Sequence, residues 1–139
     1  MARKQGLRTN YVTNGSLTEK ALGLLAPHLD VCRVDVKGFS SETYQQLAHL
    51  LDWGGILNVT ARAKRSGMHV EVVTNIIPGF NDDEKQLMKT ASWIRNCLGE
   101  DTPWHVTRFH PHLILSHLTP TPVPTLERAR TTGLNAGLQ

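Results

Sequence analysis

The sequence of 139 residues has little cysteine and no long apolar run. Its two cysteines, Cys32 and Cys97, lie far apart and belong to no Cys-x-x-Cys pair, which excludes a thiolate metal motif and a disulfide framework. We expect each to be a small buried side chain. No segment approaches the ~18 uncharged residues that a membrane span needs, and the polar residues 1–10 do not resemble a signal peptide. We therefore expect a cytoplasmic protein that does not enter a membrane.

Charge of one sign is also not concentrated anywhere in the chain. The composition, 40% hydrophobic and 19% charged, is typical of a globular protein, and the net charge is only +3. The basic residues are scattered except for Arg62, Lys64 and Arg65, which a solvated helix face explains better than a track for phosphates. We expect a single domain over residues 1–139 that does not bind nucleic acid.

What the chain does contain is one unit repeated four times. Each unit has a short apolar run, then Gly or Asn with polar residues, then a helical pattern, and this alternation predicts an α/β fold with about four parallel strands and five flanking helices. Prolines at 120, 122 and 124 predict an extended, non-helical loop that crosses the sheet edge. The four apolar runs are residues 7–12, 31–36, 70–77 and 105–109.

Polar side chains gather where these runs end. In parallel sheets and barrels, ligands bind at that edge because loops and helix N-termini converge there. Strand geometry places Asp35 and Lys37 on one face, opposite Val36, either as part of a ligand site or as a local ion pair without function. Asn81 is expected to cap the helix that follows it. The residues at this edge are Thr13, Asn14, Asp35, Lys37, Asn75, Asn81, Arg108 and His110.

Histidines are concentrated near the end of the chain, at positions 105, 110, 112 and 117. His110 and His112 would share a strand face if the strand continued through Pro111, as in metal-dependent barrel hydrolases. Acidic residues are sparse around the cluster and Pro111 interrupts the strand, so ordinary histidines are favoured over metal ligands. No Walker loop, dinucleotide fingerprint or Gly-x-Ser-x-Gly elbow occurs, and nucleophilic hydrolysis has no sequence support.

Four strings at the strand ends form a specific combination when taken in order. They are Tyr11-Val12-Thr13-Asn14-Gly15, Val34-Asp35-Val36-Lys37-Gly38-Phe39, residues 71–82 (EVVTNIIPGFND) and residues 103–111 (PWHVTRFHP). This combination resembles the radical S-adenosylmethionine (SAM) enzyme of the AmmeMemoRadiSam system, a family related to the pyruvate formate-lyase activating enzymes. The resemblance covers residues 2–137.

The resemblance implies a partial (β/α) barrel of the TIM type that uses SAM and a four-iron four-sulfur (4Fe-4S) cluster. Three cysteines in a Cys-x-x-x-Cys-x-x-Cys loop hold the cluster, which cleaves SAM to a 5′-deoxyadenosyl radical. That loop does not occur in this sequence. The chain resembles barrel units three to six, so we expect a truncated fragment that cannot bind the cluster and is inactive alone.

Site residues follow from the resemblance position by position. Lys37 matches a lysine that contacts SAM, and Asp35 matches an aspartate associated with a bound monovalent cation. Thr13 matches another residue of that cation site, although Val12 stands where the activating enzymes have aspartate. His110 matches a histidine that touches SAM on the last strand. The predicted cofactor-binding set is Thr13, Asn14, Asp35, Lys37 and His110, with no catalytic or metal-binding residue.

The resemblance also implies partners. These are the missing N-terminal half-barrel, or the Memo-type and AMMECR-type proteins of the system. An unpaired edge beside the first strand favours self-association. Two alternatives to an enzyme fragment stay open: a non-catalytic module that assembles with a separate cluster-bearing chain and, less favoured, a histidine-metal hydrolase.

Overall fold

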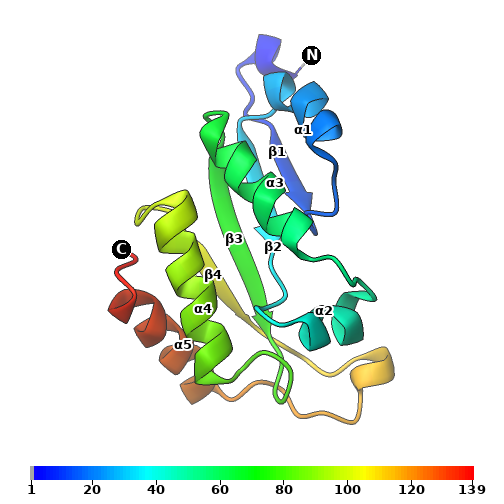
Figure 1. Cartoon of the computed structure of the whole chain (residues 1–139), viewed down its shortest axis with the longest axis vertical. Helices are drawn as coiled ribbons and strands as arrows, with labels where there is room; N and C mark the ends of the chain where they lie inside the picture. Colours follow the sequence, from blue (N-terminus) through cyan, green and yellow to red (C-terminus); the bar gives the residue numbers. More distant parts are fainter. Residues whose placement is uncertain (1) are drawn as a thin grey trace.

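One parallel sheet organises the protein, for which a computed structural model describes residues 2–139 (Figure 1). The strands lie side by side in chain order, and every neighbouring pair is parallel. This confirms the predicted α/β fold with four parallel strands and flanking helices. The strands are β1 (Asn10–Thr13), β2 (Val31–Asp35), β3 (His69–Ile76) and β4 (Trp104–Arg108).

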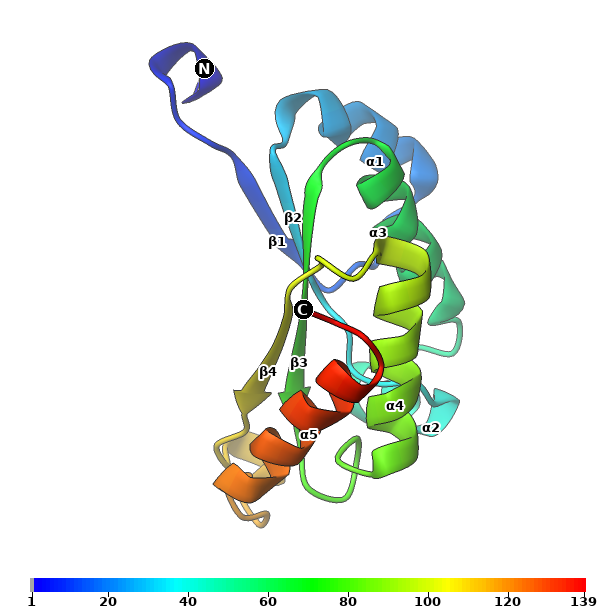
Figure 2. The same ribbon diagram turned by 90° about the vertical axis from the view of Figure 1, so that its left-hand side faces the viewer.

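Each strand is followed by at least one α-helix, and α1, α3 and α4 cover one side of the sheet (Figure 2). Right-handed crossovers between strands in sequential order place every connecting helix on the same face, which is how a barrel wall is built. A π-helical turn over Ile94–Leu98 continues α4. The helices are α1 (Glu19–Leu25), α2 (Ser41–Ala48), α3 (Gly54–Arg65), α4 (Glu84–Trp93) and α5 (Val123–Asn135), with short 3-10 turns at Ala2–Gln5, Ala26–His28 and Leu113–Leu115.

Helix starts show where local signals succeeded and where they failed. The side chain of Asp83 accepts from the Gln86 N–H and caps α4, so the prediction that Asn81 is the cap is wrong. Pro124 lies in the first turn of α5, where a missing N–H costs no helical hydrogen bond. The prediction that all three late prolines are extended is therefore wrong at this position.

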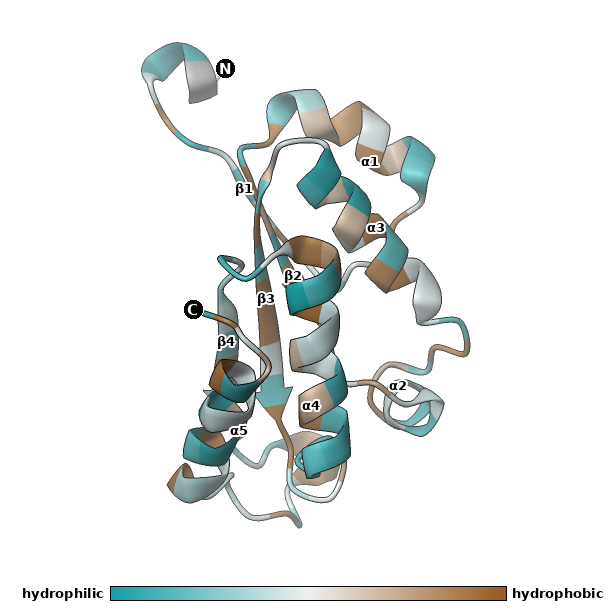
Figure 3. Cartoon of the chain, turned by 60° about the vertical axis from the view of Figure 1, so that its left-hand side comes forward, coloured by the Kyte–Doolittle hydropathy of each residue, from teal (hydrophilic) through white to brown (hydrophobic). Residues whose placement is uncertain are grey.

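The core lies between the sheet and the helices. Alternate residues of β2 and β3 are buried against α3 and α4, and in Figure 3 β3 is brown along most of its length while the helices carry teal bands. Buried side chains of the helices complete this core, which consists of a larger cluster and a smaller one around Ile76 and Leu87. The sheet residues buried on this side are Cys32, Val34, Val36, Val70, Val72 and Ile76, and the helical ones include Leu22, Ile56, Ala63, Leu87 and Ala91.

The two cysteines differ in their surroundings. Cys32 is 2% exposed, as predicted, and burial raises the pKa of its thiol. Cys97 is exposed on the π-helical turn, so the prediction that it is buried is wrong. Within residues 2–139, no helix has both the length and the apolar character to span a bilayer.

The segment between β4 and α5 runs past the carboxyl ends of the strands, reaches the side of α2 and returns (Figure 1). Thr121 ties it to the sheet, because its hydroxyl donates to the Ile76 carbonyl at 2.6 Å and accepts from the Phe109 N–H at 3.0 Å. The Arg108 Nε donates to the Thr121 carbonyl at 2.8 Å. The segment is thus a loop across the sheet edge, as the prolines predicted.

Candidate functional site

The sheet face turned away from the helices is lined mostly by polar side chains. Strand alternation and the register of the ladders place these residues on one side, opposite the buried valines. We call this side the bare face, because among residues 2–139 no helix covers it (Figure 2). It includes Val12, Arg33, Asp35, His69, Glu71, Val73, Asn75, His105 and Thr107, with Lys37 just beyond the end of β2.

Asp35 and Lys37 form an ion pair at the carboxyl end of the bare face. The Lys37 Nζ donates to Asp35 Oδ2 at 2.6 Å, while Val36 between them is fully buried on the other side. This confirms that the two charges share a face. The second carboxylate oxygen, Asp35 Oδ1, is buried and has no hydrogen-bond partner among the described residues. The ion pair therefore leaves one acceptor atom of Asp35 unused.

The turn after Lys37 favours glycine. Gly38 has φ of 153°, and a Cβ there would lie 2.7 Å from Oε1 of Gln86 and 3.2 Å from Cγ2 of Thr43. The Gln86 side chain also accepts from the Phe39 N–H at 3.2 Å. The loop leaving the ion pair is therefore held against the N-terminus of α4.

A second charged cluster lies on the bare face nearer the amino ends of the strands. Glu71 is at its centre, with Oε2 3.2 Å from Nε2 of His105 and 3.9 Å from Nε of Arg33, and with Oε1 3.4 Å from Nε2 of His69. Sequence reasoning missed this cluster, because Arg33 and Glu71 are single charges inside apolar runs. The period-two spacing of Arg33 with Asp35 on one strand, and of Glu71 with Asn75 on the next, was the signal that could have found it.

Thr13 and Asn14 are not brought to the ion pair. Thr13 lies opposite Val34 in the ladder, so its side chain is on the helix-covered side, where its hydroxyl accepts from the Gly15 N–H at 3.1 Å. The Asn14 Oδ1 accepts from the Ser16 N–H at 3.0 Å, and both side chains complete the turn after β1. On β1, the bare face is instead occupied by Val12, which is 68% exposed.

The histidines near the end of the chain do not form one group. The strand β4 ends at Arg108, so His110 and His112 lie in the loop and do not share a strand face. His110 is exposed at the same edge of the sheet as Lys37, and its predicted contact with SAM stays a prediction.

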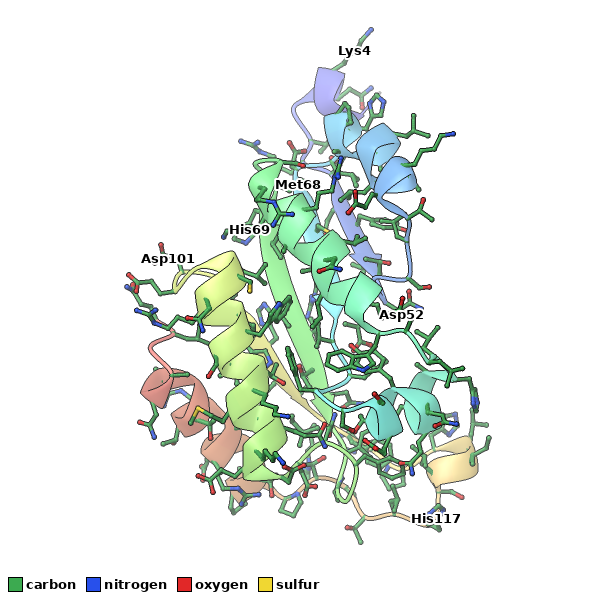
Figure 4. The ribbon with its side chains drawn as sticks, in the orientation of Figure 1. Lys4, Asp52, Met68, His69, Asp101 and His117 are labelled. Atoms are coloured by element: carbon green, nitrogen blue, oxygen red, sulfur yellow. The ribbon has the colours of Figure 1, made fainter. Side chains whose placement is uncertain are left out.

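The remaining histidines are dispersed as well. Figure 4 places His69, at the start of β3, far from His117. His105 is engaged with Glu71 on the bare face. Across residues 2–139, no three His, Cys, Asp or Glu side chains are arranged so that they could hold a metal ion. The metal-dependent hydrolase alternative therefore has no observation in its favour.

Comparison with known proteins places this geometry in context. No model of a protein family matches the chain. It is 33% identical, over its entire length, to an uncharacterised protein of Methanocaldococcus jannaschii, of which it spans 40%. It is 28% identical over 138 residues to the isethionate sulfite-lyase activating enzyme of Desulfovibrio desulfuricans, of which it spans 44%. The chain thus covers less than half the length of both relatives.

Solved structures show the same fold. A domain of the pyruvate-formate lyase-activating enzyme from Bacteroides vulgatus superimposes with a TM-score of 0.83 at 15% identity, covering 99% of this chain and 81% of that one. A radical SAM methyltransferase from Sphaerobacter thermophilus superimposes with a TM-score of 0.70 at 14% identity, covering 96% of this chain and 40% of the other. The structure therefore resembles a domain of the radical SAM activating enzymes.

Proposed function

We propose that this chain provides part of the SAM-binding wall of a radical SAM enzyme of the activating-enzyme type, belonging to the AmmeMemoRadiSam system, and that it is inactive alone. The observation that carries the proposal is the Asp35–Lys37 pair, with its unused acceptor atom, at the carboxyl end of the bare face. Ligands of parallel α/β folds bind at that end. The fold of this chain, shared with activating enzymes, makes SAM the ligand class to expect.

The residues at this end suit the polar groups of SAM. The Lys37 ammonium group is a donor for a carboxylate, and the Lys37 side chain as a whole is 27% exposed. The unpartnered Asp35 Oδ1 offers an acceptor to a cationic or N–H group. His110 adds a ring donor from the loop after β4. SAM, once bound, would supply the radical chemistry, while these side chains would only bind and orient it.

The cysteines do not fit an iron-sulfur cluster. Cubane clusters of this class need three thiolates, whereas Cys32 is buried on the helix-covered side and Cys97 is exposed beyond α4. The cluster would have to come from a different part of the protein or from another chain. We therefore assign this chain the binding of SAM and no step of its cleavage.

Calorimetric titration of the chain with SAM tests the proposal. Lys37→Gln is expected to weaken binding by on the order of tenfold, the loss of one hydrogen bond to a charged group. Lys89→Gln, which removes an exposed lysine of α4, should leave the affinity unchanged. Equal affinities for the wild-type chain and Lys37→Gln would contradict the proposal.

A second candidate function, an assembly module, is favoured by the edge of the sheet. Within the described residues β1 pairs with β2 alone, and its other edge exposes main-chain donors and acceptors. A half-barrel that carries the three-cysteine loop would extend the sheet there and cover the bare face. Memo-type and AMMECR-type proteins remain proposed partners of the assembled enzyme.

The assembly is tested by co-expression with a polypeptide that carries the three-cysteine loop. We expect a stable complex that contains iron and sulfide and binds SAM more tightly than either chain. Sedimentation of the isolated chain should show concentration-dependent self-association through the β1 edge. A compact monomer that binds no cluster-bearing chain would contradict this second function.

A further inference from the structure

Lys37 lies beyond the end of β2, where side chains take over from the sheet in holding the main chain. Val36 still extends the ladder, since its N–H donates to the Val73 carbonyl at 2.9 Å. At Lys37 the N–H donates to the Tyr44 hydroxyl oxygen at 3.2 Å, and the carbonyl accepts from Asn81 Nδ2 at 2.7 Å. Tyr44 is 0% and Asn81 is 2% exposed. Two buried side chains, Tyr44 and Asn81, thus form hydrogen bonds with the main-chain N–H and carbonyl of Lys37.

The Asn81 side chain joins the ends of two strands. Besides the Lys37 carbonyl, its Nδ2 donates to the Asn75 carbonyl at 2.9 Å, and its Oδ1 accepts from the Ile77 N–H at 2.7 Å. Both donors and the acceptor of the amide are therefore used. Aspartate has the same shape but no N–H, so it would set an oxygen against two carbonyl oxygens.

These hydrogen bonds matter because Lys37 also carries a charged side chain. The Lys37 side chain turns onto the bare face, where its ammonium group reaches Asp35, while its main chain is anchored in the core. The closed turn at Gly38 fixes the exit of the chain. Because these hydrogen bonds hold the main chain of Lys37, the position of its ammonium group depends on them and on the rotamer of the side chain.

We propose that Asn81 and Tyr44 are positioning residues, which hold the Lys37 main chain so that its ammonium group stands beside Asp35 on the bare face. The proposal rests on the proposed SAM-binding function for its ligand. The arrangement itself exists without a ligand, so it can be tested separately. Neither residue touches the ligand; they act through Lys37.

Nuclear magnetic resonance of the whole chain gives a readout that does not require SAM. The ε-methylene signal of Lys37 is assigned by its disappearance in Lys37→Gln, and Asp35→Asn provides the position of the unpaired lysine. Asn81→Asp is expected to move the signal toward that unpaired position. Tyr44→Phe keeps the ring and removes only the hydroxyl, so it should move the signal in the same direction by less.

The matched control is Thr60→Ala. Thr60 is 0% exposed and its hydroxyl donates to the Ile56 carbonyl within α3, so its loss removes a buried hydrogen bond without touching Lys37. The control should leave the Lys37 signal in place. Unchanged Lys37 signals in folded Tyr44→Phe, and in Asn81→Asp where it folds, would overturn the proposal, and so would an equal shift in Thr60→Ala.

Titration with SAM separates this proposal from the function on which it rests. Asn81→Asp is expected to weaken SAM binding by on the order of tenfold, because one hydrogen bond to a charged group is misplaced. Thr60→Ala should leave the affinity for SAM unchanged. If wild-type protein binds no SAM while the Lys37 signal responds as expected, the proposed function fails and the positioning role stands. If SAM binds equally to Asn81→Asp and to wild-type protein, the positioning role fails.

Discussion

The two faces of the sheet are made from alternate residues of the same strands, and they have opposite chemistry. The covered face presents side chains such as Val34, Val70 and Val72, each 1% exposed or less, to the helices. The bare face presents a pair and a cluster of charges, Asp35–Lys37 and Arg33–Glu71–His105, which no helix shields in residues 2–139. Burial of apolar area stabilises the fold, whereas half-exposed charges contribute little. Packing alone therefore does not account for the charges of the bare face, and the proposed ligand would.

The largest difference in stability between the two faces is expected when a charge is placed on the covered face. Val72→Asp places an unpaired carboxylate at a fully buried position of β3 and is expected to lower the free energy of unfolding by more than about 4 kcal/mol. Val12→Asp, on the bare face beside Arg33, should change it by less than ~0.5 kcal/mol. Urea unfolding followed by circular dichroism measures both. Similar losses in the two variants would show that the faces do not differ as described.

High pH should lower the stability of the protein through the buried tyrosine Tyr44, which accepts a hydrogen bond from the Lys37 N–H. Burial, and to a smaller extent the charge of Asp35, raises the pKa of Tyr44 to about 12, although the hydrogen bond from Lys37 lowers it. The unfolded chain releases this proton near pH 10, so between about pH 10 and 12 the folded state binds more protons and stability falls as pH rises.

The size of this effect can be isolated with Tyr44→Phe. Between pH 9 and pH 11.5 the wild-type protein should lose about 2 kcal/mol more than the variant, because 1.5 pH units of differential proton binding correspond to that free energy. Urea unfolding at each pH gives the difference, and absorbance at 295 nm should show one tyrosine ionising late. Parallel pH profiles of the two proteins would mean that the hydroxyl is not buried.

A smaller effect is expected from the cap of α4 on the covered side. Burial raises the pKa of Asp83, but N–H donors, above all that of Gln86, lower it more, and the net pKa is depressed. Its contribution is present above the ordinary pKa of aspartate and is lost as pH falls through the depressed value. Asp83→Ala should cost about 1 kcal/mol at pH 7 and almost nothing near pH 2. Asp101→Ala, at an exposed site without a capping role, serves as the control in thermal unfolding, and equal losses would contradict the cap.

The smallest effect is expected at the centre of the bare-face cluster. Glu71→Gln keeps the shape of the side chain and removes its charge from between Arg33 and His105, and it should change stability by less than about 0.5 kcal/mol, as for other half-exposed ion pairs. Unfolding at low and high salt checks this value. A loss above about 2 kcal/mol would show that the cluster stabilises the fold like a buried network.

Much of the fold was readable from local sequence. The apolar runs and helical patterns predicted the four strands and five α-helices found in residues 2–139, although β1 starts at Asn10 rather than at residue 7. The first run is short and weakly apolar, so its boundaries and the orientation of Thr13 carried little signal. The pair of Asp35 and Lys37 was predictable because period-two geometry acts within three consecutive residues.

The sequence by itself determined the order of elements, the parallel sheet and the shared face of Asp35 and Lys37, because periodicity and turn residues act over short stretches of chain. Tertiary structure decided which residues meet across the sheet. Asn81 reaches the Lys37 carbonyl across 44 positions, and Glu71 meets His105 across 34. Such contacts depend on the register between strands and on the packing of helices, which no local pattern specifies.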